Sequence, residues 1–206
     1  MLIRDFNKMY CLNLKRRPDR LARCKEIFSE YKLDVTFIEA VDGKELSEIG
    51  DLKPGEAGCC LSHRNLLESI LEDKSIKTAL IMEDDVEFIN HMPTYFSNFY
   101  KDVPKDWHLL YFGGSHRWNP LNRISPHVHK LKKTYTTHCY GIKREAIVDV
   151  LAFFAKERIF LKAADLHLAE YQKRSGKCYG FLPSIAWQRA DYSDIREDFK
   201  DYKHIR

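Results

Sequence analysis

The sequence lacks the features that mark membrane-spanning, secreted and nucleic-acid-binding chains. It has no apolar run near the roughly 18 residues that a membrane span needs, and no N-terminal apolar segment like that of a signal peptide. Lys and Arg total 34 against 30 for Asp and Glu, and this net charge of +4 is spread along the chain. So mild a balance does not argue for nucleic acid, but it fits phosphorylated ligands or an anionic surface. We therefore expect a cytoplasmic protein, with peripheral contact to a membrane left open.

Cysteine spacing and composition exclude further classes. The six cysteines include no C-x-x-C pair and no spacing typical of a zinc site, so we expect free thiols in a reducing compartment. The 206 residues are 44% hydrophobic, with no low-complexity segment, repeat or linker. Length and composition together predict one globular domain over residues 1–206.

Apolar patterning predicts strands that alternate with helices. Strands are expected at 9–14, 35–38, 78–82, 107–112 and 136–142, with short ones at 179–182 and 185–187; helices are expected at 18–31, 55–74, 143–155 and 163–173. Such alternation predicts an α/β fold with a mostly parallel central sheet. Residues 113–134 have no periodicity and are expected to form a long loop, of the kind that serves as a lid or a binding segment.

Three adjacent carboxylates, Glu83, Asp84 and Asp85, follow the expected buried strand at 78–82. In open α/β sheets, ligands bind beyond the carboxyl ends of the strands. Carboxylates crowded there repel one another and lose hydration, and a divalent cation offsets both effects. We therefore favour a site for Mg²⁺ or Mn²⁺, held by one or two of these residues together with substrate phosphates. The alternative is an acidic turn with solvated side chains.

A basic cluster follows the first expected strand. Arg16, Arg17 and Arg20 lie where that strand ends and where a helix begins with Pro18. Guanidinium groups beside a helix N-terminus suit a phosphate or a nucleotide. The alternative is a solvated charged face, which is the more common role of a charge run.

Two helix N-termini and one polar segment hold further candidates. His63 falls on the apolar face of its helix, where a histidine is either a hydrogen-bonded core residue or a ligand contact. Gly55 and Gly58, in the first turn, allow close approach of a ligand or of neighbouring backbone. Asp165 opens a later helix as either an N-terminal cap or a catalytic base. The polar segment 188–195 follows a short strand, and a turn is its simplest interpretation.

Taken together, five segments in order resemble glycosyltransferase family 25, which includes lipooligosaccharide glycosyltransferases and collagen galactosyltransferases. They are residues 12–20 (LNLKRRPDR), 39–44 (EAVDGK), 55–63 (GEAGCCLSH), 79–85 (ALIMEDD), and Gln188 with 193–195 (SDI), alongside Asp165 in an Asp-x-x-Leu context. The similarity spans nearly the whole chain. It implies a single-domain, Rossmann-like nucleotide-diphospho-sugar transferase of the GT-A type, inverting at the anomeric carbon.

The resemblance also implies roles for individual residues. The acidic triplet stands where related enzymes carry an Asp-x-Asp metal motif, so Asp85 with Glu83 or Asp84 is expected to hold Mn²⁺ or Mg²⁺. Donor binding is expected from the first-strand segment and the helix from Gly55; the residues are Asn13, Arg16, Arg17, Arg20, Glu56, Ser62 and His63. Inversion needs a base, for which Asp165 is the first choice and Asp194 the second. Acceptor choice is expected to lie in residues 113–134.

These expectations define a function. We expect transfer of a hexose, galactose or glucose, from a UDP-sugar to a hydroxyl acceptor on a glycan or protein, as in lipopolysaccharide biosynthesis. The alternative from another class is a catalytically inactive homologue that binds a nucleotide or glycan. Donor turnover with a cation present separates these two. A metal-dependent phosphohydrolase is a third hypothesis, supported by the carboxylates alone.

Overall fold

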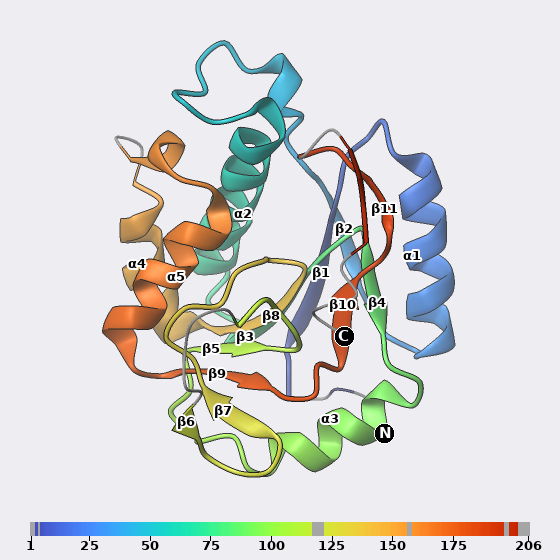
Figure 1. Ribbon diagram of the computed structural model, residues 1–206, viewed down its shortest axis with the longest axis vertical. Helices are drawn as coiled ribbons and strands as arrows, with labels where there is room; N and C mark the ends of the chain where they lie inside the picture. The colour runs from blue at the N-terminus through green and yellow to red at the C-terminus, as the bar shows by residue number, and fades with distance from the viewer. Residues whose placement is uncertain (1–2, 4, 117–121, 156–157, 196–197, 202–206) are drawn as a thin grey trace.

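The computed structural model describes residues 3, 5–116, 122–155, 158–195 and 198–201. In that part of the chain, helices cover both faces of a central eight-stranded sheet (Figure 1). One face carries α2 (Pro54–Glu72), α4 (Arg144–Phe153) and α5 (Ala164–Ser175), and the other carries α1 (Pro18–Glu30) and α3 (Met92–Tyr100). Among these helices, none has the length and apolar character needed to cross a bilayer. The predicted α/β layering is confirmed.

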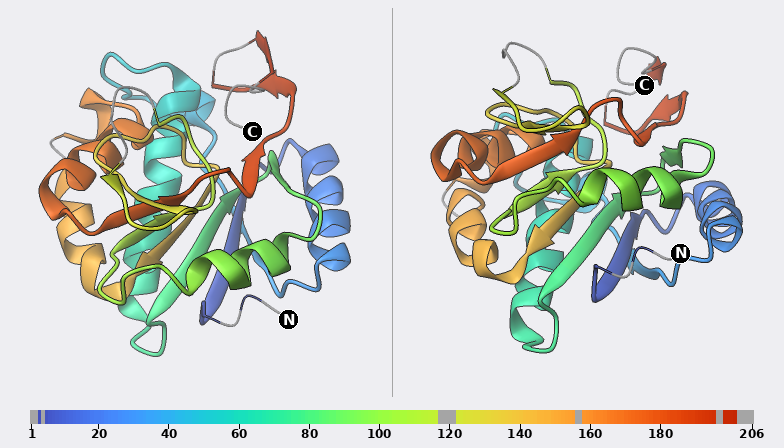
Figure 2. Two further views of the ribbon diagram at one scale, coloured as in Figure 1. Left: turned by 60° about the horizontal axis from the view of Figure 1, so that its bottom comes forward. Right: turned by 90° about the horizontal axis from the view of Figure 1, so that it is seen from below.

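The central sheet has the order β2-β1-β3-β8-β5-β9-β7-β6 (Figure 2). Its strands are β1 (Lys8–Asn13), β2 (Thr36–Glu39), β3 (Thr78–Glu83), β5 (Leu109–Tyr111), β6 (Asn122–Arg123), β7 (Val128–Lys130), β8 (Cys139–Lys143) and β9 (Cys178–Phe181). β7 and β8 run opposite to the other strands. The sheet is therefore mostly parallel, as predicted.

Smaller elements complete the fold, and those after β9 bring the C-terminal part of the chain back to the end of β3. These elements are η1 (Gly43–Glu45), β4 (Val86–Phe88), η2 (Ile159–Leu161), β10 (Ala186–Gln188), β11 (Asp191–Ser193) and β12 (Asp198–Lys200). β10 pairs with β4, and β11 pairs with β12. The backbone N–H of Arg189 donates to the backbone oxygen of Asp85 at 2.7 Å. This contact fixes the segment after β10 beside the acidic triplet.

Alternate residues of β3 enter two different cores. Leu80 and Met82 pack on the side of α1 and α3, whereas Ala79 and Ile81 pack on the side of α2, α4 and α5. A strand buried on both faces is apolar throughout, which is why β3 has a continuous apolar run in the sequence. Glu83 lies two residues beyond Ile81, so strand alternation directs its side chain toward α2.

One prediction about local structure is wrong, and one helix was not predicted. Residues 113–134 are not one long loop: 117–121 lie outside the described residues, but β6 and β7 form a hairpin, and β7 pairs with β9 at the edge of the sheet. Helix α3, Met92–Tyr100, is absent from the predicted elements. Strands of two and three residues are too short to show periodicity, and their pairing is decided by tertiary contacts.

Candidate active site

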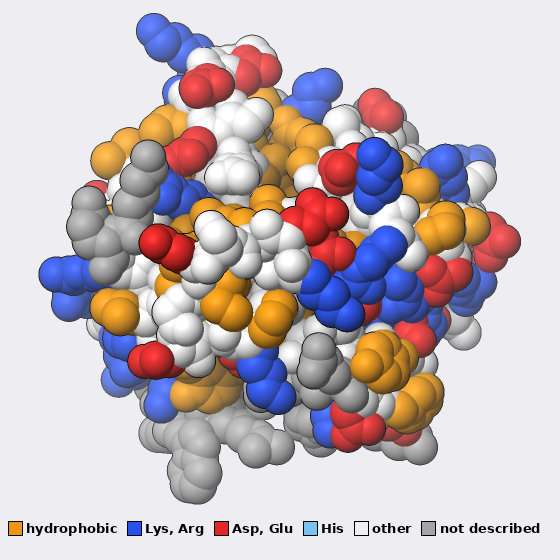
Figure 3. Space-filling view, turned by 90° about the horizontal axis from the view of Figure 1, so that it is seen from above, with side chains coloured by type: hydrophobic (Ala, Val, Ile, Leu, Met, Phe, Trp, Pro, Cys, Tyr) orange, Lys and Arg blue, Asp and Glu red, His pale blue; other side chains and the backbone are white. Residues whose placement is uncertain are grey.

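The carboxyl ends of β1 and β3 meet the N-termini of α2 and α5 at a cavity of about 220 Å³, which residues 193–195 also line. Every predicted site residue lines this cavity except Asn13 and Arg17, which bind residues that do. From above, acidic and basic side chains lie side by side near the middle of the molecular face (Figure 3). Segments far apart in the sequence thus form one site.

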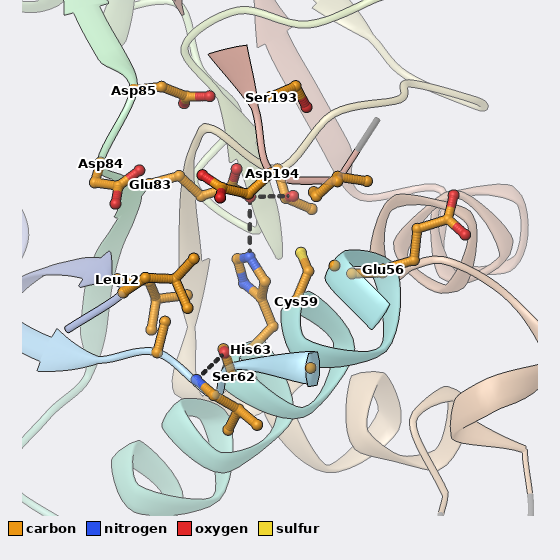
Figure 4. A pocket seen from close by; sticks show the side chains of 18 of the residues that line it. Leu12, Glu56, Cys59, Ser62, His63, Glu83, Asp84, Asp85, Ser193 and Asp194 are labelled. Atoms are coloured by element: carbon orange, nitrogen blue, oxygen red, sulfur yellow. Dashed lines mark hydrogen bonds and ion pairs between the residues drawn. The ribbon is translucent and has the colours of Figure 1, made fainter. Parts of the chain in front are cut away.

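The acidic triplet of the cavity is not a solvated turn. Asp84 is 6% exposed, and the side chains of Asp85 and Glu83 are 13% and 15% exposed. Carboxylates buried to this degree need cations or hydrogen-bond donors. The three residues meet this need in different ways (Figure 4).

Asp84 is bound by the chain through both of its oxygens. Its Oδ1 accepts from Arg20 Nη1 at 2.7 Å, and its Oδ2 accepts from Asn13 Nδ2 at 2.8 Å. Burial nevertheless raises the pKa of Asp84 above its ordinary value. Asp84 therefore anchors the end of β3 to β1 and α1.

Asp85 has one satisfied oxygen and one unsatisfied oxygen. Its Oδ2 accepts from Gln188 Nε2 at 3.2 Å and lies 3.9 Å from Arg20 Nη1. Its Oδ1 is buried and has no hydrogen-bond donor among the described residues. Burial, with the nearby charge of Glu83, raises the pKa of Asp85 to about 7. A buried carboxylate oxygen without a donor fits a hard, oxygen-ligated cation.

Glu83 is held by donors from α2 and from the segment before β8. Its Oε1 lies 3.2 Å from His63 Nε2 and accepts from the Thr137 hydroxyl, while Tyr140 Oη lies 3.0 Å from His63 Nδ1. Burial alone would raise the pKa of Glu83, but the hydrogen bonds of His63 and Thr137 outweigh it and lower this pKa. His63 is fully buried, so it is a hydrogen-bonded core residue that also reaches the acidic triplet.

Cys59, His63 and Glu83 form a second candidate set of metal ligands. Their ligand atoms lie within 4.8 Å of one another, and Figure 4 shows the three side chains together. Both ring nitrogens of His63 already have hydrogen-bond partners. Burial also raises the pKa of Cys59 well above its ordinary value, which keeps the thiol protonated. We therefore interpret these residues as a hydrogen-bonded cluster.

The arginines of the basic cluster differ in burial. The Arg17 and Arg20 side chains are 14% and 8% exposed, so a solvated face is the wrong interpretation for these two. Arg16 is 37% exposed and lines the cavity. The basic cluster predicted from the sequence is therefore a partly buried group of cationic side chains.

Each of these arginines binds carboxylates of the chain itself. Arg16 binds Asp42 and Asp194 at 2.5 Å each. Arg17 binds Asp194 at 2.6 Å, Asp19 at 2.8 Å and Asp191 at 3.3 Å. Arg20 binds Asp84 at 2.7 Å and Asp191 at 3.1 Å. Burial raises the pKa of Asp194, but the hydrogen bonds from Arg16 and Arg17 outweigh this effect and lower its pKa. An anionic ligand of this cluster must therefore share or displace these carboxylates.

Asp165 lies in the first turn of α5, but it does not cap the helix. The N-cap position is Ala163, which has no side-chain capping bond. The Oδ2 of Asp165 instead accepts from the backbone N–H of Thr136 at 3.2 Å. Thr136 has a φ of +75°, a conformation that is strained for a β-branched residue. This local geometry places the Asp165 carboxylate at the cavity.

The two other α2 residues predicted to bind the donor, Glu56 and Ser62, accept hydrogen bonds from backbone N–H groups. Glu56 Oε2 accepts from the Lys53 N–H at 3.1 Å, and Ser62 Oγ accepts from the Val41 N–H at 2.8 Å. A Cβ on Gly55 would lie 2.6 Å from the backbone oxygen of Asp194. Glycine in this turn was expected to allow close approach of either a ligand or neighbouring backbone, and the structure shows the approach of neighbouring backbone.

Sequence reasoning did not single out Thr137, Tyr140 or Asp191. Thr137 and Tyr140 flank the start of β8, which pairs with β3 in antiparallel register. That register, and not any local spacing, brings them to Glu83 and His63. Asp191 belonged to a segment that was interpreted as a turn, and its position beside Asp194 was the available signal.

The chain matches a known protein family over most of its length. The sequence model of "Glycosyltransferase family 25 (LPS biosynthesis protein)" matches residues 6–163. The chain belongs to glycosyltransferase family 25.

Similar proteins include a procollagen galactosyltransferase and a glycosyltransferase 25 family member. The chain is 31% identical over 130 residues to procollagen galactosyltransferase 2 of Mus musculus, covering 52% of this chain and 21% of that protein. It is 34% identical over 103 residues to a glycosyltransferase 25 family member of Drosophila melanogaster, covering 41% and 17%. The chain thus spans about a fifth of the length of these relatives.

One of the similar solved structures is a glycosyltransferase involved in the glycosylation of the major capsid of PBCV-1. Its identity to this chain is 11%, its TM-score is 0.45, and the match covers 72% of this chain and 66% of that chain.

Proposed function

We propose that the chain transfers a hexose, galactose or glucose, from a UDP-sugar to a hydroxyl group of a glycan or protein, with inversion at the anomeric carbon. One observation carries this proposal: the separate segments that resemble the family converge on one cavity. Its acidic wall is formed by Glu83, Asp84 and Asp85, and its basic wall by Arg16 and Arg20 together with the neighbouring Arg17. Membership in the family and the galactosyltransferase names of its relatives support the reaction class and the sugar.

The acidic wall is the proposed metal site. Asp85 offers a buried oxygen without a donor, and Glu83 lines the same cavity. Asp84 is less suited because Arg20 and Asn13 bind both of its oxygens. We therefore assign Asp85 and Glu83 to a divalent cation, Mn²⁺ or Mg²⁺. Such an ion would offset the negative charge that develops on the leaving diphosphate.

The basic wall is the proposed site for the donor phosphates. Arg16 lines the cavity and is the most exposed of the three arginines, so a phosphate can reach it first. Arg17 does not line the cavity and holds Asp194, whereas Arg20 lines it and holds Asp84. Planar guanidinium groups bind phosphate through paired hydrogen bonds, which suits a diphosphate in a fixed orientation.

Asp165 remains our first choice for the general base, and Asp194 the second. A base must accept a proton from the acceptor hydroxyl. Asp194 is bound by two guanidinium groups that lower its pKa, which weakens it as a proton acceptor. Asp165 accepts a backbone N–H bond and lines the cavity from α5.

The test is transfer from UDP-galactose or UDP-glucose to water or a sugar acceptor, with Mn²⁺ or with chelator. We expect Mn²⁺-dependent release of UDP, and a rate in Asp165→Asn lower by about 10²–10⁴-fold with donor binding intact. Asparagine can still accept the Thr136 N–H, so the fold should survive the change. UDP-sugar binding without turnover in the wild type would instead support the inactive, ligand-binding homologue.

A further inference from the structure

Tyr140 places a hydroxyl group in the core directly behind the acidic wall. Tyr140 lies in β8, is fully buried, and is opposite Ile81 of β3 in the register. Glu83 follows Ile81 by two residues and so lies on the same face of the sheet. A buried tyrosine hydroxyl needs a hydrogen-bond partner, and the structure supplies His63 Nδ1 at 3.0 Å.

The direction of these hydrogen bonds follows from the chemistry of the groups. An ionised carboxylate only accepts, so His63 Nε2 carries a hydrogen and donates to Glu83 Oε1 over 3.2 Å. In the neutral ring with its hydrogen on Nε2, Nδ1 is an acceptor, and the Tyr140 hydroxyl donates to it over 3.0 Å. The Thr137 hydroxyl donates to the same Oε1. Two donors thus orient the Glu83 carboxylate from one oxygen.

We propose that Tyr140 is a positioning residue for Glu83 and acts through His63. Its effect on metal binding rests on the proposed function, in which Glu83 is a metal ligand. Without the hydroxyl, Nδ1 of His63 loses its hydrogen-bond partner, so the ring is less restricted in orientation and holds Oε1 less firmly. Partners that orient a metal ligand typically change metal affinity about 10–100-fold, and for Tyr140, one contact further away, we expect about 5–10-fold.

The chain offers a matched control for this residue. Tyr111 of β5 stacks on Tyr140, with ring centroids 5.8 Å apart, and is 1% exposed. Its hydroxyl accepts from Gln172 Nε2 at 3.0 Å. Tyr140→Phe and Tyr111→Phe each remove one buried hydroxyl and keep the ring. The two variants should therefore lose similar amounts of stability, and only Tyr140→Phe should affect His63.

The first measurement is made on metal-free protein. Long-range ¹H–¹⁵N spectra of the histidine rings report which nitrogen carries the hydrogen, and His63→Gln identifies the His63 signals. We expect the Nε2–H form in the wild type and in Tyr111→Phe, and a shifted or averaged pattern in Tyr140→Phe. Unchanged His63 nitrogen shifts in Tyr140→Phe would overturn the proposal.

The second measurement is the affinity for Mn²⁺ alone, followed by its electron paramagnetic resonance signal. We expect weaker binding by about 5–10-fold in Tyr140→Phe and none of this loss in Tyr111→Phe. In a His63→Gln background, Tyr140→Phe should add nothing, because the coupling passes through His63. An equal loss in that background would overturn the proposal. If the wild type binds no Mn²⁺, the proposed metal site fails, and the His63 spectra alone decide the role of Tyr140.

Discussion

The two walls of the cavity carry opposite charge and differ in whether the chain itself supplies partners for that charge. On the basic wall, Arg16, Arg17 and Arg20 each bind carboxylates of the chain at 2.5–3.3 Å. On the acidic wall, Asp85 accepts one hydrogen bond from Gln188, and its Oδ1 has no donor among the described residues. The basic wall is therefore electrostatically complete without a ligand, whereas the acidic wall is not.

This difference separates the two kinds of ligand. A cation at Asp85 meets an oxygen that is already desolvated and displaces no bond to Oδ1. An anion at Arg16 meets a guanidinium group that Asp42 and Asp194 already hold. We therefore expect the acidic wall to govern the largest effects on turnover, and competition with carboxylates to govern smaller effects on donor affinity.

Among changes in the two walls, the largest effect is expected from Asp85→Asn. Loss of one anionic metal ligand should reduce Mn²⁺-dependent transfer by about 10²–10³-fold, because a bound metal supplies several kcal/mol of charge stabilisation. Thermal stability in chelator should be equal or higher, since the change removes a charge from a buried cluster. Activity and a melting curve for the same preparation check both parts.

A matched control for Asp85→Asn is Asp106→Asn, whose side chain is 61% exposed and lies outside the cavity lining. It should change neither activity nor stability by a measurable amount. Wild-type transfer in Asp85→Asn, with the same Mn²⁺ dependence, would contradict the proposed metal site.

The next effect is expected from Asp84→Asn and is structural. Removing one partner of a buried ion pair costs about 3–5 kcal/mol, and Arg20 keeps Asp191, so we expect about 3 kcal/mol of lost unfolding free energy. Denaturant unfolding of Asp84→Asn and Asp85→Asn side by side measures this contrast. If Asp85→Asn were the less stable of the two, the assignment of anchor and ligand would have to be exchanged.

The sequence predicted the buried framework of the fold better than its edges. β3 and α2 were predicted almost to their ends because apolar spacing reports burial directly, on both faces of β3 and on one face of α2. The β6–β7 hairpin and α3 were missed. Their positions depend on the edge of the sheet and on aromatic packing, such as the stack of Phe96 on Phe112, which no local pattern encodes.

The site was predicted as a set of residues but not as a network. Local motifs located the acidic triplet and the arginines, and the structure brings them to one cavity. The pairing of Arg20 with Asp84, 64 positions apart, and of Arg16 with Asp194, 178 positions apart, could not be derived from spacing. Motifs indicate which groups are present, whereas strand register decides which groups neutralise one another.

A smaller effect is expected from Arg16→Ala on the basic wall. Charge-assisted hydrogen bonds contribute about 1.5–3 kcal/mol, so affinity for UDP should fall about tenfold or more, as measured by calorimetry. Arg23→Ala is the control, because Arg23 lies in α1, is 50% exposed and does not line the cavity. Equal UDP affinity in both variants would place the donor phosphates elsewhere.

The smallest effect is expected from Asp194→Asn, and its sign is informative. Asp194 holds Arg16 and Arg17, so it competes with a phosphate for the same donors. Asparagine keeps the shape of the side chain but removes its charge, so a phosphate no longer competes with the Asp194 ion pairs. Partly exposed ion pairs contribute about 0.2–1 kcal/mol, and UDP should therefore bind about two- to fivefold more tightly. Asp19→Asn is the control, because Asp19 pairs with Arg17 but is 63% exposed and outside the cavity lining. If Asp194 were instead the general base, UDP affinity would stay unchanged while transfer fell by about 10²–10⁴-fold, which would reverse our ranking of Asp165 over Asp194.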